Sequence, residues 1–421
     1  MNENLLTEVE KELSKCNRCG TCTAYCPVFL QTNEEWHSAR GRMALLEAVA
    51  KKRIKESAFY KDVIFSCLYC HTCVENCPSG VAVDEFIILA REQYINKKGL
   101  PLIQKLGLET LKNKKTLETG IKTLGLLERY SPNFIKKIFL SLLSKNGNRT
   151  IPPFAKKPLS KQLPEKIPVK KPKLKVAFFT GCLIEYIYPE IGISLVNLLK
   201  NQGIEIIIPK EQYCCGIPLL TSGDREGAEF LARKNIELFT QLDVDYIVNA
   251  CATCGSTLKD YEKLLGKWKL ENGNSKFKTQ NSKLSIGNWA ERIYDISEFL
   301  VKFTDLKFNA TREAKVTYHD PCHLRKRQRI YEEPRQILKS MPSIDFIEME
   351  EADFCCGGGG LFSFKYYDIS KKIAQRKIRN AEQTQADYIV TGCPGCILHL
   401  NDILTQKKSD QKAIHLIELI K

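Results

Sequence analysis

The sequence predicts a helical, cysteine-rich N-terminal domain followed by two α/β domains with parallel sheets, a fold class that combines α+β with α/β. Three observations support this prediction. All 18 cysteines stand in short clusters, and residues 78–181 contain none. A proline- and lysine-rich stretch precedes residue 172. Beyond it, short β-rich runs alternate with helical patterns, as in α/β folds, and 421 residues suffice for two or three domains.

The clustering of the cysteines indicates metal or redox sites. Disulfide scaffolds distribute bridges through small secreted domains, whereas grouped thiols in a long chain are typical of metal ligation. The first cluster cysteine is Cys16, where a signal peptide would still be running, and no apolar run is long enough to span a bilayer. We therefore expect a cytoplasmic protein, either soluble or peripheral on the inner face of the cell membrane.

The N-terminal domain, expected over residues 1–98, contains two cysteine runs of the same spacing. These runs are Cys16, Cys19, Cys22, Cys26 and Pro27, then Cys67, Cys70, Cys73, Cys77 and Pro78. In this bacterial ferredoxin spacing, three thiolates hold one cubane 4Fe-4S cluster and the fourth reaches the other cluster. Two zinc sites would leave the third and fourth cysteines and the proline of each run unexplained.

The spacing assigns the eight cysteines to two cubane clusters. The first would be held by Cys16, Cys19, Cys22 and Cys77, and the second by Cys67, Cys70, Cys73 and Cys26.

Arg40 and Arg42 lie between the two runs, before a helix expected over residues 43–50. These arginines could donate to cluster sulfurs or to carboxylates of a partner, or they could form a solvated helix start. His71, within the second run, could tune a reduction potential, but we expect it to be exposed on its loop.

The middle region, expected over residues 99–172, starts with lysine-rich amphipathic helices and ends in a linker. The basic stretch Phe134–Lys145 could lie on a membrane or pack against the cluster domains, and packing is the favoured expectation. Six prolines interleaved with lysines follow, at positions 152, 153, 158, 164, 168 and 172. Proline disfavours helix, so an extended connection and a domain boundary near residue 172 are predicted.

The C-terminal region contains an internal repeat, visible in its cysteines. The first copy has Cys182, Cys214, Cys215, Cys251 and Cys254, and the second has Cys322, Cys355, Cys356, Cys393 and Cys396. Each cysteine recurs 140 to 142 residues later, which is unlikely to arise by chance. We expect one domain over residues 173–310 and another over residues 311–421.

The cysteines of each repeat follow short β-rich runs. The expected strands are residues 175–179, 204–208, 246–248, 316–318 and 388–390. Between them lie helical patterns, such as Ile369, Ile373, Ala374 and Ile378 on one face. Ligands of parallel α/β sheets gather beyond the carboxyl ends of the strands, so these thiols are expected at the functional end of each sheet.

The densest polar group of the sequence is His319, Asp320 and His323 around Cys322. Either histidine could move protons beside a redox centre, or simply support the cysteine loop. The glycine run 357–360 follows a cysteine pair and lacks the dinucleotide-binding fingerprint, so close backbone approach to a cluster explains it better.

The repeats resemble the CCG-motif family that includes the heterodisulfide reductase B and D subunits. The resemblance rests on Cys214-Cys215-Gly216 and Cys355-Cys356-Gly357, each with an upstream cysteine and a later C-x-x-C pair. It implies that each set of five cysteines can hold a noncubane 4Fe-4S cluster. It also implies two α/β domains related by a pseudo-twofold axis.

The layout of the whole chain resembles the iron–sulfur subunit of glycolate oxidase. Two features depart from that pattern: Ala39 stands where relatives tend to have proline, and the second CCG motif is complete. Iron–sulfur subunits of lactate and anaerobic glycerol-3-phosphate dehydrogenases, and heterodisulfide-type relatives, therefore stay open.

The formal net charge is +15 before any cluster is counted. Four clusters of about −2 each would lower it to about +7, which is compatible with an acidic partner or an anionic membrane surface. The lysines are dispersed and no recognition motif accompanies them, so nucleic-acid binding is not expected.

These observations together predict a single-electron carrier. The sequence contains no flavin or nicotinamide fingerprint, so we expect neither cofactor in this chain. The resemblance implies that a separate FAD subunit oxidises glycolate or D-lactate and that electrons leave this chain toward a quinone or membrane carrier. The alternative, implied by the heterodisulfide reductase resemblance, is disulfide or thiol chemistry at the noncubane clusters.

Overall fold

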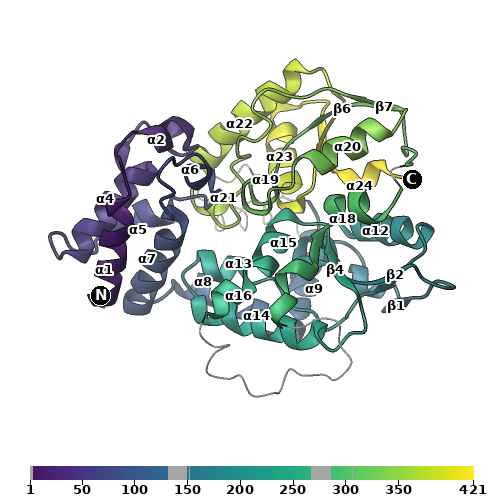
Figure 1. Cartoon of the computed structure of the whole chain (residues 1–421), viewed down its shortest axis with the longest axis horizontal. Coiled ribbons are helices and arrows are strands. Elements are labelled where there is room, and N and C mark those ends of the chain that lie inside the picture. The colour runs from purple at the N-terminus through teal and green to yellow at the C-terminus, as the bar shows by residue number, and fades with distance from the viewer. Residues whose placement is uncertain (1–2, 131–148, 151, 267–285, 306) are drawn as a thin grey trace.

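A computed structural model of the chain describes residues 3–130, 149–150, 152–266, 286–305 and 307–421. A helical lobe formed by the N-terminal residues lies beside two α/β units, each built on its own sheet (Figure 1). The basic stretch Phe134–Lys145 lies outside the described residues. Within the described part of the chain, no helix is long and apolar enough to cross a membrane.

The N-terminal lobe is helical throughout. Its helices are α1 (Glu3–Ser14), α2 (Thr21–Tyr25), α3 (Phe29–Thr32), α4 (Ala39–Ala50), α5 (Ala58–Phe65), α6 (Thr72–Glu75) and α7 (Val83–Lys98). Apolar side chains of α4, α5 and α7, among them Met43, Ile64 and Ile87, form its core. A short 3-10 helix, η1 (Glu35–His37), precedes α4.

Helix α4 begins four residues earlier than the sequence suggested. The Ser38 side chain accepts a hydrogen bond from the Gly41 amide at 3.0 Å, so it caps the helix at Ala39. This cap places Arg40 and Arg42 within the first turn. A Cβ at Gly41 would collide with the carbonyl oxygen of Glu35, so only glycine allows η1 to lie so close.

The first sheet has the strand order β1-β3-β2-β4-β5. Its strands are β1 (Lys166–Ile167), β2 (Leu174–Phe179), β3 (Ile204–Ile207), β4 (Tyr246–Asn249) and β5 (Ile293–Asp295). Strands β2 to β5 are parallel as predicted, but β1 pairs antiparallel with β3, so the sheet is mixed. The connection from β1 to β2 is too short for the crossover that a parallel arrangement needs.

Helices surround the first sheet and lead into it. They are α8 (Leu102–Lys112), α9 (Lys114–Tyr130), α11 (Gly181–Tyr186), α12 (Pro189–Asn201), α13 (Ile217–Thr221), α14 (Arg225–Phe239), α15 (Ala252–Lys259), α16 (Tyr261–Leu265) and α18 (Ile296–Phe303). Three further 3-10 turns are η2 (Leu159–Lys161), η3 (Ile286–Asn288) and η4 (Ala290–Arg292).

The second sheet has the order β7-β6-β8-β9 and is parallel throughout. Its strands are β6 (Ala314–Tyr318), β7 (Ile344–Phe346), β8 (Tyr388–Thr391) and β9 (Lys412–His415). The helices around it are α19 (Cys322–Gln328), α20 (Glu332–Ser340), α21 (Phe362–Lys365), α22 (Tyr367–Gln383), α23 (Pro394–Lys407) and α24 (Leu416–Leu419).

The two α/β units repeat one another in detail. Val176 pairs with Tyr246 in the first sheet, and Val316 pairs with Tyr388 in the second. The Asp245 carboxylate accepts from the Lys175 amide at 2.9 Å, and the Asp387 carboxylate accepts from the Lys315 amide at 2.8 Å. The internal repeat that the cysteines predicted is therefore confirmed.

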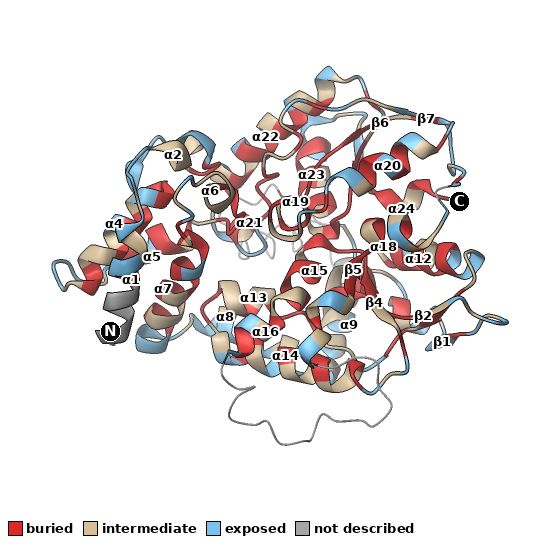
Figure 2. Cartoon of the chain, in the orientation of Figure 1, coloured by how far each residue is buried: buried red, intermediate tan, exposed pale blue. Residues whose placement is uncertain are grey.

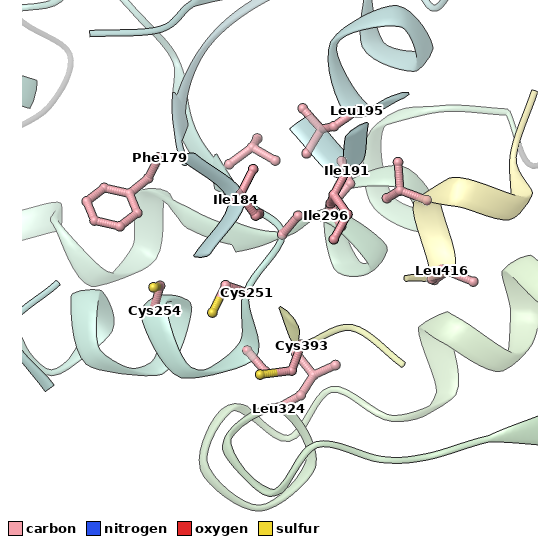
Figure 3. Packing of buried hydrophobic residues seen from close by; sticks show 14 of the residues in the cluster. Phe179, Ile184, Ile191, Leu195, Cys251, Cys254, Ile296, Leu324, Cys393 and Leu416 are labelled. Atoms are coloured by element: carbon pink, nitrogen blue, oxygen red, sulfur yellow. The ribbon is translucent and has the colours of Figure 1, made fainter. Parts of the chain in front are cut away.

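The two units share one hydrophobic core. Buried side chains of both sheets form a continuous cluster, part of which is drawn in Figure 3, and the buried residues line both sheets in Figure 2. The His415 imidazole lies 3.0 Å from the carbonyl oxygen of Ala250, so a strand end of the second unit contacts the first. This shared core holds the two sets of cysteines against one another.

Candidate metal centres

The two N-terminal cysteine runs adopt the same loop conformation. Arg18 and Gly20 in the first run have positive φ angles of 53° and 82°, and the equivalent Tyr69 and His71 have 57° and 61°. Such left-handed residues turn successive amides toward one side and create concave sites for anions. The amide of Tyr69 accordingly points at the Cys67 sulfur, 3.5 Å away.

Arg42 is a buried cation of the N-terminal lobe. Only 2% of its surface is exposed, and its Nη1 lies 3.9 Å from the Cys26 sulfur. Its guanidinium also donates to the carbonyl oxygens of Val63 and Ser66 at 3.2 and 3.1 Å. Burial opposes its charge, but the Cys67 and Cys26 thiolates outweigh that effect and raise its pKa. Arg42 thus fits an anionic group held by these cysteines.

Arg40, by contrast, is at the surface. It pairs with the exposed Glu35 at 2.5 Å. Of the two arginines that the sequence singled out, only Arg42 therefore faces a cysteine group from within the protein.

The expectation that His71 is exposed is wrong. It is only 8% exposed, and its Nδ1 lies 3.4 Å from an Asp84 carboxylate oxygen. Burial lowers its pKa well below the usual range. The reason is long-range packing, because the second α/β unit covers this loop with His323, whose ring centroid is 5.9 Å from that of His71.

The ten C-terminal cysteines lie beyond the carboxyl ends of the strands. Cys182 follows β2, Cys251 directly caps α15 after β4, and the Cys214-Cys215 pair follows β3. The second unit repeats this placement after β6, β7 and β8. Eight of the ten are buried, and Cys182 and Cys322 are intermediate.

Within each unit, the five thiols contact one another in sequence. In the first unit the contacts run Cys182–Cys214–Cys215–Cys254–Cys251. In the second they run Cys322–Cys355–Cys356–Cys396–Cys393. Five sulfurs in contact, four of them on buried residues, cannot all ionise without a nearby positive charge, and iron supplies that charge. The donor set therefore fits a thiolate-bound iron–sulfur cluster in each unit.

Three of the four cysteine groups are joined end to end. Cys251 of the first unit contacts Cys393 of the second, and Figure 3 shows these two residues on adjacent segments. Cys355 contacts Cys70 of the second N-terminal run. The sulfurs therefore form one row that crosses from the N-terminal lobe through the second unit to the first.

His319 and His323 have different surroundings. One ring nitrogen of His319 and the sulfurs of Cys356 and Cys396 all lie within 4.8 Å of one another. His319 is fully buried and, among the described residues, its nitrogens have no partner at hydrogen-bond geometry. Burial, with the charge of Lys377, lowers the pKa of His319 to about 3.

His323 joins three parts of the protein. Its Nδ1 lies 3.3 Å from the Ser256 hydroxyl of the first unit, and its Nε2 lies 3.1 Å from the Tyr69 carbonyl oxygen of the N-terminal lobe. These contacts favour a supporting role for His323. His319 is the histidine that faces the cysteines.

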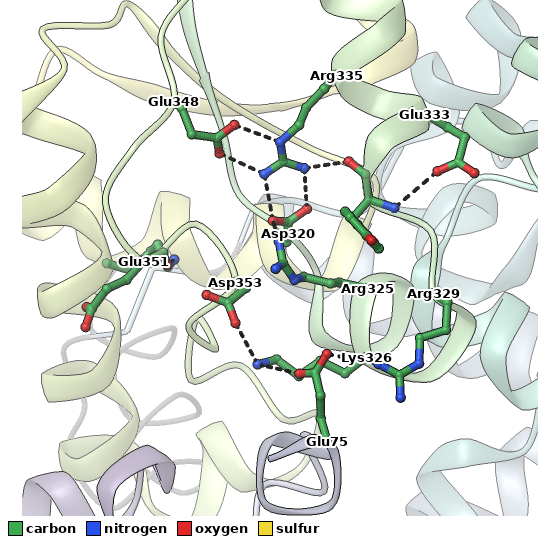
Figure 4. A network of polar contacts seen from close by, with 12 residues as sticks. Glu75, Asp320, Arg325, Lys326, Arg329, Glu333, Arg335, Glu348, Glu351 and Asp353 are labelled. Carbon is green, nitrogen blue, oxygen red and sulfur yellow. Dashed lines mark hydrogen bonds and ion pairs between the residues drawn. The ribbon is translucent and has the colours of Figure 1, made fainter.

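Sequence reasoning missed a charged network around the second cysteine group (Figure 4). Asp320 accepts two hydrogen bonds from Arg335, at 2.9 and 2.8 Å, and Lys326 donates to Asp353 at 3.0 Å. It also missed the fully buried Lys377 of α22. A signal for Lys377 was present, because it lies on the same helical face as Ile373, Ala374 and Ile378.

The fold and the cysteine groups define an iron–sulfur protein, and comparison with known proteins agrees. Residues 12–81 match the 4Fe-4S dicluster domain family, and residues 176–259 and 316–401 each match the cysteine-rich domain family.

Relatives share this layout over nearly the whole chain. A probable glycolate oxidase iron–sulfur subunit of Bacillus subtilis is 32% identical, over 98% of this chain and 94% of that protein. An uncharacterized iron–sulfur protein of Methanococcus maripaludis is 32% identical, over 97% of this chain and 73% of its own. A dihydromethanophenazine:CoB–CoM heterodisulfide reductase component of Methanosarcina acetivorans is 25% identical, over 99% of this chain and 95% of its own.

The chain therefore belongs to the family of iron–sulfur subunits that includes the glycolate oxidase subunit. One crystal structure, of a hypothetical protein from Helicobacter pylori, shares the fold with a TM-score of 0.52 at 11% identity, covering 99% of this chain and 72% of that one.

Proposed function

We propose that this chain is the iron–sulfur electron-transfer subunit of a flavin-dependent 2-hydroxy acid dehydrogenase with glycolate or D-lactate as donor. A partner subunit carrying FAD oxidises the hydroxy acid, and this chain passes the electrons, one at a time, toward a quinone or another membrane carrier from the cytoplasmic side. The similarity to the Bacillus subtilis subunit supports the donor class. The observation that carries the proposal is the row of contacting cysteines.

The proposed ligand sets follow the cysteine groups. The two cubane clusters use Cys16, Cys19, Cys22 and Cys77, and Cys67, Cys70, Cys73 and Cys26. The two noncubane clusters use Cys182, Cys214, Cys215, Cys251 and Cys254, and Cys322, Cys355, Cys356, Cys393 and Cys396. When bound, such clusters supply one-electron redox chemistry.

The protein's own part is to set the order of the sites. Cys19 is exposed, so the first N-terminal site lies at the surface, where a redox partner can dock. Cys70 is buried against Cys355, so the second N-terminal site is the one that adjoins the α/β units. The Cys251–Cys393 contact then joins the second unit to the first. The proposed route thus runs from surface to interior through all four groups.

The proposal is tested by iron and sulfide analysis with electron paramagnetic resonance on protein purified anaerobically with its flavoprotein. About sixteen irons, with two kinds of signal that respond to glycolate or D-lactate, are expected. About eight irons would mean empty five-cysteine groups and would contradict the noncubane assignment. A response to glycerol 3-phosphate alone would instead favour the iron–sulfur subunit of an anaerobic glycerol-3-phosphate dehydrogenase.

A second candidate is a heterodisulfide reductase-like subunit that performs disulfide or thiol chemistry. The observation that favours it is a small pocket of about 30 Å³ beside Cys182 and Cys214, lined also by Tyr186 and Lys210. In this candidate, a thiol would approach the first five-cysteine group from the side of this opening. Clusters that respond to disulfides or thiols, and not to hydroxy acids, would establish this candidate and exclude the first.

A further inference from the structure

The two five-cysteine groups occupy equivalent places, so their surroundings can be compared residue by residue. A Cβ at Gly216 would contact the carbonyl oxygen of Ala228 in α14, and a Cβ at Gly357 would contact that of Ser370 in α22. This match aligns α14 with α22. Seven residues further along each helix stand Asn235 and Lys377, which are therefore equivalent.

In the first unit this position is neutral. Asn235 is fully buried, and its side-chain oxygen accepts a hydrogen bond from the Tyr213 amide at 2.9 Å. Its side-chain amide donates to the Cys214 carbonyl oxygen at 3.1 Å. Asn235 thus fastens the cysteine-pair loop without adding charge. Two lysines beside this group, Lys114 and Lys210, line a pocket open to water, which screens them.

In the second unit the same position carries a cation. Lys377 is fully buried, and its ammonium donates to the carbonyl oxygen of Glu351, just before the Cys355-Cys356 pair. The charges that face it are Asp353 and Asp320 and the two cysteines of the pair.

The neighbouring carboxylates are already engaged elsewhere. Asp353 pairs with Lys326 at 3.0 Å, and Asp320 pairs with Arg335 at 2.8 Å (Figure 4). Among the described residues, Lys377 makes no ion pair within 4 Å. A buried cation without its own anion is costly, and an anionic cluster on the adjacent cysteines would remove that cost.

We propose that Lys377 is the counter-charge of the second five-cysteine group and gives the cluster there a higher reduction potential than its counterpart at the first group. The proposal rests on the proposed function, in which both groups hold clusters. Reduction by one electron adds one negative charge to a cluster. A fixed positive charge stabilises the reduced form more than the oxidised form, and Asn235 provides no such charge.

The test is a redox titration of the anaerobic holoprotein with dithionite as the electron donor, followed by electron paramagnetic resonance. Signals are assigned with Cys254→Ala, which removes a ligand of the first group, and Cys396→Ala, which removes one of the second. In the unaltered protein, the second-group signal is expected to titrate at the higher potential. Equal potentials of the two groups, or the opposite order, would overturn the proposal before any Lys377 variant is made.

Lys377→Met should lower the second-group potential and leave the first unchanged. Lys372→Met is the matched control, because it removes the same charge from an exposed position of the same helix. An unchanged second-group potential in Lys377→Met would refute the counter-charge.

Loss of the second cluster is also decisive. If it occurs in Lys377→Met but not in Lys377→Arg, the charge is needed for the cluster, which supports the proposal. If both variants lose the cluster, the cluster requires the shape of the lysine side chain and not its charge, and the proposal fails. Iron content separates the two hypotheses: about eight irons in the unaltered protein would refute the cluster assignment itself, whereas about sixteen with unmoved potentials would refute only the role of Lys377.

Discussion

Two histidines of one motif are expected to respond differently to substitution. His323→Leu removes contacts with Ser256 and Tyr69 and leaves buried polar groups unpaired, so it should destabilise the protein by about 1–3 kcal/mol. His319→Phe installs the residue found at the equivalent Phe179, and the His319 side chain has no hydrogen bond to lose among the described residues. It should leave stability nearly unchanged and alter the resonance signal of the second cluster.

Thermal unfolding of both anaerobic variants, with their spectra, checks this contrast. Equal destabilisation would show that His319 also has a supporting role. If His319→Phe alters neither the spectrum nor the turnover nor the potentials, the proton-transfer hypothesis for His319 is excluded.

At the residue scale, the sequence indicated which side chains gather but not how each is surrounded. The run Arg40-Gly41-Arg42 was visible in the sequence. The start of the helix at the Ser38 cap was not, and in that helix it is Arg42 that lies beside Cys26. His71 is buried by a segment more than 200 residues away in the sequence. The ligand assignments themselves stay predictions.

At the scale of single elements, the residue that caps helix α18, Asp295, makes the stability of the protein depend on pH. Its carboxylate accepts from the Ser297 amide at 2.9 Å and so caps the helix. Burial raises the pKa of Asp295 from its ordinary 3.8 to about 7. Its other oxygen has no partner among the described residues, which makes a negative charge on this buried carboxylate unfavourable.

The sign of the pH effect follows from this raised pKa. The folded state retains a proton that the unfolded chain releases above about pH 4, so stability falls as the pH rises from about 4 to about 7. Asp295→Asn keeps the cap without the titration. The stability of the variant relative to the unaltered protein should therefore be higher at pH 8 than at pH 5, as measured by thermal unfolding at each pH. A constant difference between the two pH values would contradict the prediction.

The elements were predicted where they adjoin cysteines. The structure forms strands over all five β-rich runs that precede the cysteine groups, as β2, β3, β4, β6 and β8. Four strands were not anticipated: β1, β5, β7 and β9, each of two to four residues. Such short runs carry too few residues for a periodic pattern, and their neighbours in the sheet decide their conformation.

At the scale of the whole molecule, electron transfer depends on how the N-terminal lobe docks, which no local pattern encodes. The Arg91 guanidinium of α7 donates to the Thr221 carbonyl oxygen at 2.9 Å and to that of Cys67 at 2.6 Å. Next to this contact lies Gly223, with φ of 87°. A Cβ at Gly223 would stand 2.6 Å from the Arg91 carbonyl oxygen, so only glycine allows the lobe to sit this close.

Gly223→Ala is therefore expected to push the lobe away and slow electron passage across the Cys70–Cys355 contact. Gly203→Ala is the matched control, since Gly203 has φ of 78° but a Cβ there would meet only the Lys173 side chain, at 3.9 Å. Both variants carry about 1–2 kcal/mol of backbone strain, but only the first disturbs the docking. Rapid-freeze resonance after reduction should show N-terminal clusters reduced and α/β clusters lagging in Gly223→Ala alone. If both variants transfer electrons at the same rate, the N-terminal lobe does not deliver electrons through this contact.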